Sequence, residues 1–146
     1  MKLTFFRAFA LAALSFAAGS IATYKFANPA RVSADANKVY ELRVYHAMPG
    51  RLGDIVKRFK DDTRKEFDKH NMTSIGYWVP QDDPRKSNEL IYILSHPSRE
   101  AATKNWKDFA TSPEWKAIVA RTEANGKIVD HVDSTYMDPT DFSALK

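Results

Sequence analysis

Alternating polar and apolar residues near position 40 give the clearest structural signal in the chain. Alternate positions of residues 39–45 form two sets, an apolar one of Tyr40, Leu42 and Val44 and a charged, aromatic one of Glu41, Arg43 and Tyr45. Because successive side chains of a strand point to opposite faces, this pattern predicts a strand with two different sides. We expect helices to cover the apolar side and the charged, aromatic side to be left uncovered by them.

The pattern changes to helical spacing after Pro49-Gly50. Apolar residues then recur three or four positions apart, at Leu52, Ile55, Val56, Phe59, Thr63 and Phe67. Between them stand charged residues that we expect to form a solvated face, namely Arg58, Asp61, Asp62, Lys65 and Lys69. This spacing predicts an amphipathic helix that ends near Asn71.

Three further strands and a second helical region follow. Residues 73–79 and 89–94 are rich in aromatic and β-branched residues and predict two strands joined by a polar loop. Ser98 and Ser112 are typical helix N-caps, and Pro113 suits a first helical position, so residues 98–124 predict two consecutive helical pieces. Residues 128–136 predict the last strand, which ends before Asp138-Pro139.

The order strand, helix, strand, strand, helix, strand predicts an α+β domain. It is the ferredoxin-like βαββαβ arrangement, with an antiparallel sheet and helices on one face. We expect the first and third strands of this sheet to lie side by side and parallel, since a helix is present in each crossover.

Several short segments, in this order and spacing, give the chain a resemblance to the NIPSNAP family. They are residues 40–45, Pro49-Gly50, Gly76-Tyr77-Trp78, residues 88–92, Pro113-Glu114-Trp115 and residues 139–143. The resemblance covers residues 38–143, which we take as one domain. It implies a dimeric α/β barrel, in which two copies pack sheet to sheet and enclose an interior between their uncovered faces. The expected partner is therefore a second copy of the chain.

Residues 1–34 predict an export signal followed by a linker. Lys2 and Arg7 precede a charge-free run of 17 residues from Ala8 to Tyr24, with small residues near position 34. Cleavage would give a periplasmic or secreted protein. Retention of residues 8–24 as a membrane anchor is an alternative. A mitochondrial transit peptide is a third interpretation and ranks last, because such peptides are amphipathic and this segment is continuously apolar.

The net positive charge of the chain comes from residues 1–34. The net charge is +4, and residues 1–34 contain four basic and no acidic residues, so 18 basic and 18 acidic residues remain from Asp35 onward. Nucleic-acid binding requires a clustered excess of Lys and Arg. We therefore expect no nucleic-acid partner, and membrane contact only through an uncleaved N-terminal segment.

Arg43, Tyr45 and Trp78 are the candidate ligand-binding residues. A guanidinium holds an anionic head group by charge-assisted hydrogen bonds, and the aromatic rings suit a partly apolar molecule. The alternative for Arg43 is an ion pair with Glu41 of a second copy or with Asp130. Trp78 and Tyr77 point to opposite faces of their strand, so one of them at most lines a pocket, and core packing is the alternative for both.

Histidines are the weaker candidates for catalysis. His131 lies within a predicted strand, where we expect Asp133 rather than Asp130 to share its face and orient it as a general base. His46 and His96 each end a strand, and the expected topology brings them near each other. No histidine pair has the spacing of a metal site, the chain has no cysteine, and no phosphate-binding loop or nucleophile elbow is present. We therefore expect neither a metal nor a cofactor.

Two functions remain open at this stage. The first is an exported homodimer that binds a small, partly apolar molecule between its two sheets, or that acts as a scaffold. The second is a cofactor-independent oxygenase or isomerase that acts in the barrel cavity, which rests on analogy between folds. An enzyme would place His131 or His46 near Tyr45 or Arg43.

Overall fold

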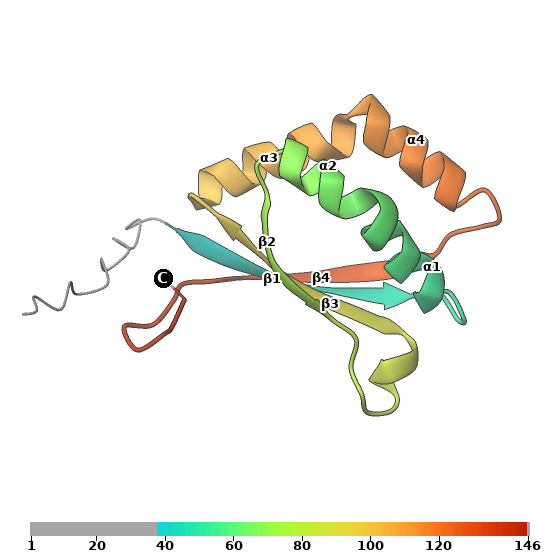
Figure 1. The fold of residues 1–146 in the computed structure, drawn as a ribbon, viewed down its shortest axis with the longest axis horizontal. Coiled ribbons are helices and arrows are strands. Elements are labelled where there is room, and N and C mark those ends of the chain that lie inside the picture. Colours follow the sequence, from blue (N-terminus) through green and yellow to red (C-terminus); the bar gives the residue numbers. More distant parts are fainter. Residues whose placement is uncertain (1–37, 146) are drawn as a thin grey trace, which may run out of the picture. The chain divides into compact units, whose positions relative to one another are not determined.

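A computed structural model describes residues 38–145 of the chain. The strands are β1 (Val39–Ala47), β2 (Thr73–Trp78), β3 (Glu89–His96) and β4 (Val129–Met137). The helices are α1 (Leu52–Arg58), the π-helical turn η1 (Phe59–Thr63), α2 (Arg64–Lys69), the 3-10 turn η2 (Arg85–Ser87), α3 (Arg99–Thr111) and α4 (Pro113–Thr122). This order is the βαββαβ pattern that the sequence predicts, and Figure 1 shows it.

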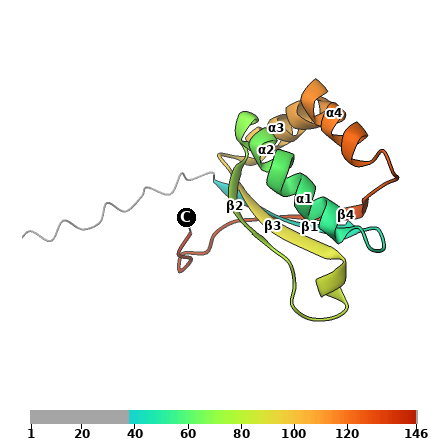
Figure 2. The same cartoon turned by 45° about the vertical axis from the view of Figure 1, so that its right-hand side comes forward.

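The four strands form one antiparallel sheet in the order β2-β3-β1-β4. The antiparallel sheet with helices on one face is confirmed (Figures 1 and 2). Our expectation of a parallel first and third strand is wrong, because β1 and β3 are antiparallel and pair Val39 with His96 and His46 with Glu89. The helical crossover makes β1 and β2 run the same way, and the hairpin after β2 then turns β3 back between them.

The first helical layer is one continuous segment formed by α1, η1 and α2. Ile55, Phe59 and Phe67 are buried on its sheet side, as predicted. Arg58 departs from the prediction: its side chain is buried rather than solvated. It pairs with Glu123 at 2.9 Å and lies over the ring of Trp115, so the second helical region covers it.

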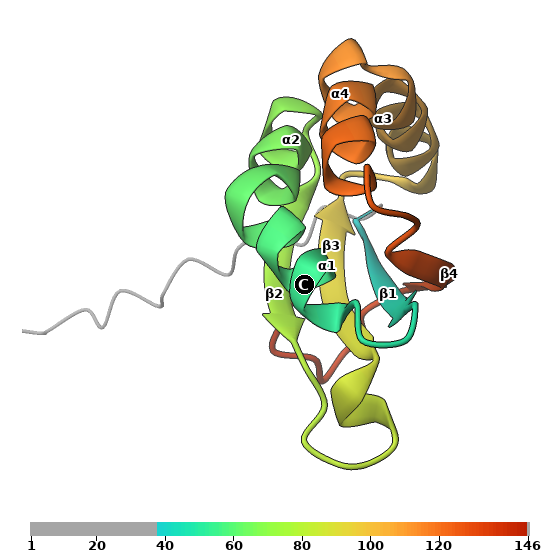
Figure 3. The same ribbon diagram turned by 90° about the vertical axis from the view of Figure 1, so that its right-hand side faces the viewer.

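The helices α3 and α4 begin where the sequence places them. The Ser98 hydroxyl accepts a hydrogen bond from the backbone N–H of Ala101, and the Ser112 hydroxyl accepts one from that of Trp115. Each cap satisfies a helix N–H that has no partner within the helix. Figure 3 shows α3 and α4 beside the α1–α2 segment, on the same side of the sheet.

Aromatic rings fill the space between the helices and the sheet. Phe67 lies 5.8 Å from Tyr92 and 5.2 Å from Phe109, measured between ring centroids, and Tyr45 lies 5.3 Å from Phe59. All five of these residues are buried. Rings at such distances add favourable edge and tilted contacts to the burial of apolar area. The helix side of β1 therefore includes Tyr45.

This packing reverses the predicted assignment of the two sides of β1. Glu41, Arg43 and Tyr45 face the helices, whereas Leu42 and Val44 lie on the side that no helix of the described residues covers. Charged residues tolerate this position because they pair with one another there. An apolar strand side alone does not identify the side on which helices pack.

The uncovered side, which we call the open face, is apolar at its centre. It carries Leu42 and Val44 of β1, Ile91 and Ile93 of β3 and Trp78 of β2. The indole of Trp78 is half exposed and lies over Gly76, where an added Cβ would be 2.6 Å from the ring. Leu42, Val44, Ile91 and Ile93 are partly exposed there.

The predictions for the N-terminal segment concern residues outside the described part of the chain. The predicted signal, anchor and linker of residues 1–34 all precede residue 38. Within residues 38–145, no helix combines the length and hydrophobicity needed to cross a bilayer.

Candidate functional site

A buried carboxylate lies at the centre of a polar cluster between the sheet and α3. The side chain of Glu41 is fully buried, and its Oε2 accepts a hydrogen bond from the indole N–H of Trp106 at 2.6 Å and lies 3.0 Å from Nε2 of His96. Its Oε1 accepts bonds from the Ser134 hydroxyl at 2.7 Å and from Nη1 of Arg43 at 2.8 Å. Residues of four elements thus converge on one carboxylate.

Antiparallel pairing on both sides of β1 explains this convergence. Glu41 lies opposite Leu94 of β3 and Tyr136 of β4, so His96 and Ser134 are each two residues from a direct partner. Side chains two positions apart share a face of the sheet. Trp106 completes the set from α3, which packs above these strands.

These hydrogen bonds control the charge of Glu41. Burial alone would raise the pKa of the carboxyl, but hydrogen bonds from His96, Ser134, Trp106 and Arg43 outweigh it and lower the pKa from 4.5 to about 2. Glu41 is therefore ionised in the folded protein throughout the physiological pH range. The cluster contains a permanent buried anion.

Arg43 supplies the balancing cation. Burial would lower the pKa of its guanidinium, but Tyr92, Tyr45 and Glu41 raise it above its ordinary value. The guanidinium carbon lies 4.1 Å from the ring centroid of Trp106 and 5.8 Å from that of Tyr45. Ion pairing and two aromatic rings thus hold Arg43 in place.

Three polar atoms around this cluster are buried without a hydrogen-bond partner in the described part of the chain. They are Nε of Arg43, Nδ1 of His96 and the hydroxyl oxygen of Tyr92. Burial also raises the pKa of the Tyr92 phenol well above its ordinary value, so this group is a neutral hydroxyl. Buried polar groups nearly always have partners, and each exception requires an explanation.

The edge strand β4 forms the solvent-exposed boundary of the cluster. Ser134 is exposed, Tyr136 is half-buried, and 17% of the Arg43 side chain is accessible. The guanidinium of Arg99 lies over the ring of Tyr136, 3.1 Å from its centroid. A small anion that approaches past Ser134 would therefore meet two cations and several aromatic rings.

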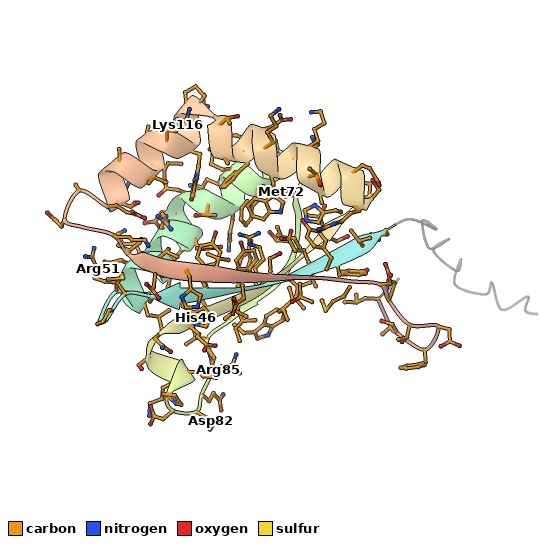
Figure 4. The ribbon with its side chains drawn as sticks, turned by 180° about the vertical axis from the view of Figure 1, so that it is seen from behind. His46, Arg51, Met72, Asp82, Arg85 and Lys116 are labelled. Atoms are coloured by element: carbon orange, nitrogen blue, oxygen red, sulfur yellow. The ribbon has the colours of Figure 1, made fainter. Side chains whose placement is uncertain are left out.

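A second group of titratable residues lies on the open face. The rings of His46 and His131 are stacked, with centroids 4.0 Å apart and planes inclined by 9°. Nε2 of His46 lies 3.1 Å from Oδ2 of Asp133, and one ligand atom from each of these three residues lies within 4.8 Å of the other two. Figure 4 shows His46 where β1 and β4 lie side by side.

Comparison with known proteins agrees with the topology. The NIPSNAP family model matches residues 40–144, most of the chain and nearly all of its described part. The chain belongs to the NIPSNAP family. A search of curated proteins found no match.

Solved structures of other NIPSNAP proteins share this fold. A NIPSNAP family protein of Agrobacterium tumefaciens superposes with a TM-score of 0.65 at 20% identity, covering 75% of this chain and all 100% of that one. A NIPSNAP-like domain protein of Burkholderia xenovorans gives a TM-score of 0.63 at 17% identity, covering 73% of this chain and 89% of that one. At such identities the likeness establishes the fold alone.

The three predicted ligand-binding residues of this NIPSNAP chain do not form one site. Arg43 and Tyr45 lie together on the helix side of the sheet, whereas Trp78 is on the open face. Arg43 pairs with Glu41 of its own chain, so the proposed pair with Asp130 does not form. Tyr77, the neighbour of Trp78, packs against Phe59 at 5.8 Å between ring centroids, which confirms its core role.

Two predictions about histidines are wrong. His46 and His96 lie at opposite ends of the β1–β3 ladder because these strands are antiparallel. His131 shares the open face with Asp133, as predicted, but the carboxylate that it contacts is that of Asp130, with 2.7 Å between Nδ1 and Oδ2, while Asp133 pairs with His46. The β-bulge between His46 and Ala47 disturbs the alternation of sides at this end of β4.

Sequence reasoning also missed His96 and Trp106 as members of the Glu41 cluster. His96 follows Leu90, Tyr92 and Leu94 at two-residue spacing, so extending β3 by two residues would have placed it on the helix side. Trp106 lies at helical spacing from Ala102 and Phe109, but nothing in that spacing reveals a buried carboxylate opposite its indole N–H.

Proposed function

We propose that this protein is a homodimer that binds a small, partly apolar, anionic molecule beside Arg43 in each subunit. The observation that carries the ligand proposal is the group of buried, unpartnered polar atoms on Arg43, Tyr92 and His96. A carboxylate or similar group would accept the Nε–H of Arg43, and the neighbouring rings would contact its apolar part. The ligand site thus lies under α3 rather than between two sheets.

The charge balance of the cluster supports an anion over a cation. Glu41 already has four hydrogen-bond partners, including Arg43. The second cation nearby, Arg99, contacts the ring of Tyr136 and is exposed. An incoming anion would therefore find the Nε–H of Arg43 without an acceptor, whereas an incoming cation would compete with Arg43 for a carboxylate that is already satisfied.

Ligand binding is tested with octanoate, benzoate and inorganic phosphate as probes. Native mass spectrometry of the full chain first checks for a co-purified molecule, and calorimetric titration then measures each probe. We expect the partly apolar anions to bind more tightly than phosphate, and Arg43→Gln to weaken binding at least about tenfold, the equivalent of about 1.4 kcal/mol. Arg121→Gln is the matched control, since Arg121 pairs with Asp62 away from the cluster.

Loss of the fold must be separated from loss of the site. Arg43→Gln is used only if its circular dichroism spectrum and thermal midpoint show a folded protein, and Ser134→Leu provides a second variant that blocks the approach from an exposed position. No co-purified molecule together with no binding of any probe, or equal binding by Arg43→Gln and the parent, would contradict the proposal.

The dimer forms through the open face. Its apolar centre, described above, would leave water when the same surface of a second copy packs against it, and a two-fold interface brings one patch against itself. Light scattering of the full chain should give twice the chain mass of 16.6 kDa. Leu42→Glu should give single chains, whereas Val56→Glu, at another exposed apolar position on α1, should leave the dimer intact.

Export is the third part of the proposal. The positively charged start and the apolar run from Ala8 to Tyr24 support recognition as a signal, as argued from the sequence. Intact mass measurement after expression in a bacterial host reports whether the leader is removed, and fractionation reports the compartment. A full-length protein in the soluble cytoplasmic fraction would contradict this part and leave the ligand and dimer proposals standing.

The enzyme alternative lacks the arrangement that we expected of it. His46 and His131 lie on the open face, and Arg43 and Tyr45 lie on the helix side, so the sheet separates the two pairs. Ligand binding is therefore the function that the geometry supports better.

A further inference from the structure

A row of titratable side chains crosses the open face at one end of the sheet. Strand register places Glu89 of β3 next to His46 of β1, and His46 next to His131 of β4. Asp133 lies two residues beyond His131 and contacts His46. None of these residues belongs to the Glu41 cluster, which lies on the other side of the sheet.

We propose that His46, His131 and Asp133 bind a divalent transition-metal ion, with zinc as the best fit. Two imidazole nitrogens and one carboxylate oxygen are a donor set that suits zinc and other late first-row metals better than magnesium or calcium. All three residues come from one chain, so the site does not depend on the proposed dimer or on the anion site.

The positions of the ligand atoms are close to those that zinc requires. A tetrahedral zinc ion with bonds of about 2.0 to 2.2 Å holds its ligand atoms roughly 3.3 Å apart. Nε2 of His46 and Oδ2 of Asp133 are already 3.1 Å apart. The ligand atom of His131 lies within 4.8 Å of both, and 56% of this side chain is exposed. Because the two rings are stacked with nearly parallel planes, one of them must turn out of the stack to direct a nitrogen at the same ion, and the exposed ring of His131 has the space to do so.

The outer contacts of both histidines fit the same role. Nδ1 of His131 lies 2.7 Å from Oδ2 of Asp130, and Nδ1 of His46 lies 3.8 Å from Oε1 of Glu89. The carboxylate of Asp130 is thus within hydrogen-bond distance of His131, whereas Glu89 lies near His46 but beyond that distance. Such carboxylates fix the tautomer and orientation of metal-binding histidines and increase their basicity.

In a single chain the ion would have three protein ligands and at least one position open to solvent. Asp133 is 70% exposed and His46 is 20% exposed, so the site lies at the surface of the described domain. Three protein ligands with an open fourth position distinguish exchangeable or reactive zinc sites from closed structural ones. We therefore expect reversible zinc binding that the fold itself does not require.

Zinc titration of the untagged full chain, first stripped with a chelator, tests the proposal. Competition with a chromophoric zinc indicator should show saturable uptake of one zinc ion per chain, and excess magnesium should not displace it. Asp133→Asn and His131→Gln should each weaken zinc affinity at least about tenfold, and Asp130→Asn, which alters an outer contact, by roughly 10- to 100-fold. Both Asp133 and His131 are exposed, so these variants should remain folded.

His70→Gln is the matched control. His70 ends α2 on the helix side of the sheet, where its Nδ1 contacts the Glu66 carbonyl oxygen. Zinc affinity should be unchanged in this variant. Absence of zinc uptake by the parent chain, unchanged affinity in both Asp133→Asn and His131→Gln, or an equal loss in His70→Gln would overturn the proposal.

Discussion

The two sides of the sheet differ in a way that the sequence of β1 does not reveal. The side under the helices contains a buried ion pair, Glu41 with Arg43, while the open face contains Leu42 and Val44. The charged side is the more completely buried, and its two charged groups, Glu41 and Arg43, pair with each other there. In this NIPSNAP domain the helices therefore pack on the side whose polar groups they can pair with. The apolar side of a single strand instead indicates a surface on which something else should pack.

Removal of the central carboxylate should break this arrangement and have the largest effect. Glu41→Ala leaves Arg43 buried without its anion and deprives Trp106 and Ser134 of an acceptor. We expect the free energy of unfolding to fall by about 3 to 5 kcal/mol, as for other broken buried ion pairs. Denaturant unfolding measures it, with Glu100→Gln, at an exposed acid, as a control that should change by less than about 1 kcal/mol. A small loss in Glu41→Ala would mean that the cluster contributes little to stability.

A matched pair of leucines compares the two sides directly. Leu94 is fully buried under the helices, whereas Leu42 is half-buried on the open face. Leu94→Ala should cost about 3 kcal/mol of unfolding free energy, since it leaves a cavity in a packed core. Leu42→Ala should cost less than about 1 kcal/mol within a single chain and act instead on dimer dissociation, which dilution monitored by light scattering reports. Equal losses in dilute single chains would show that the two sides are equally packed.

The sequence predicts the elements of this fold well and their contacts poorly. Caps at Ser98 and Ser112 and the spacing of Phe59 and Phe67 depend on neighbours a few residues away, so local patterns suffice for them. The covered side of β1 depends on α3, about 60 residues further along the chain. The alternation of side chains within residues 39–45 does not show which side of β1 is covered by α3.

The sequence did not predict the residues of the candidate sites correctly, for a related reason. The sequence predicts Arg43 as a ligand-binding cation or as the ion-pair partner of Asp130 or of Glu41 in a second copy, whereas it pairs with Glu41 of its own chain. The stack of His46 on His131 requires the β1–β4 register and a bulge at Ala47, which only paired strands define. The sequence shows which residue types are present, whereas the contacts between them depend on the antiparallel order of the paired strands.

Acidification should sharpen the comparison by weakening the covered side most, because Glu41 is the buried carboxylate with a strongly lowered pKa. The folded pKa of Glu41, about 2, lies below the value of 4.5 that it takes without the fold, so its ionisation stabilises the folded state above pH 4.5. This contribution is lost as the pH falls from 4.5 toward 2. By pH 3 the loss should reach about 2 kcal/mol. Unfolding free energies measured between pH 6 and pH 3 check this.

Glu41→Gln is the control for the pH effect, because it cannot titrate. The difference in unfolding free energy between the parent and Glu41→Gln should shrink as the pH approaches about 3, by the amount that the parent loses. A constant difference across this range would show that another group causes the acid sensitivity.

The smallest expected effect concerns the open face at Gly76. An alanine there would place its Cβ 2.6 Å from the indole of Trp78, but this ring is half exposed and meets the new methyl group with its far end. The ring should therefore swing away, with a loss of less than about 1 kcal/mol in the stability of a single chain. Because Trp78 belongs to the proposed interface, dimer dissociation should increase by more than unfolding does. In a Trp78→Leu background the same Gly76→Ala change should have no further effect, since the two residues interact directly. A loss of several kcal/mol that persists without the indole would instead mean that the backbone of β2 requires glycine here, and that the open face is as tightly constrained as the covered one.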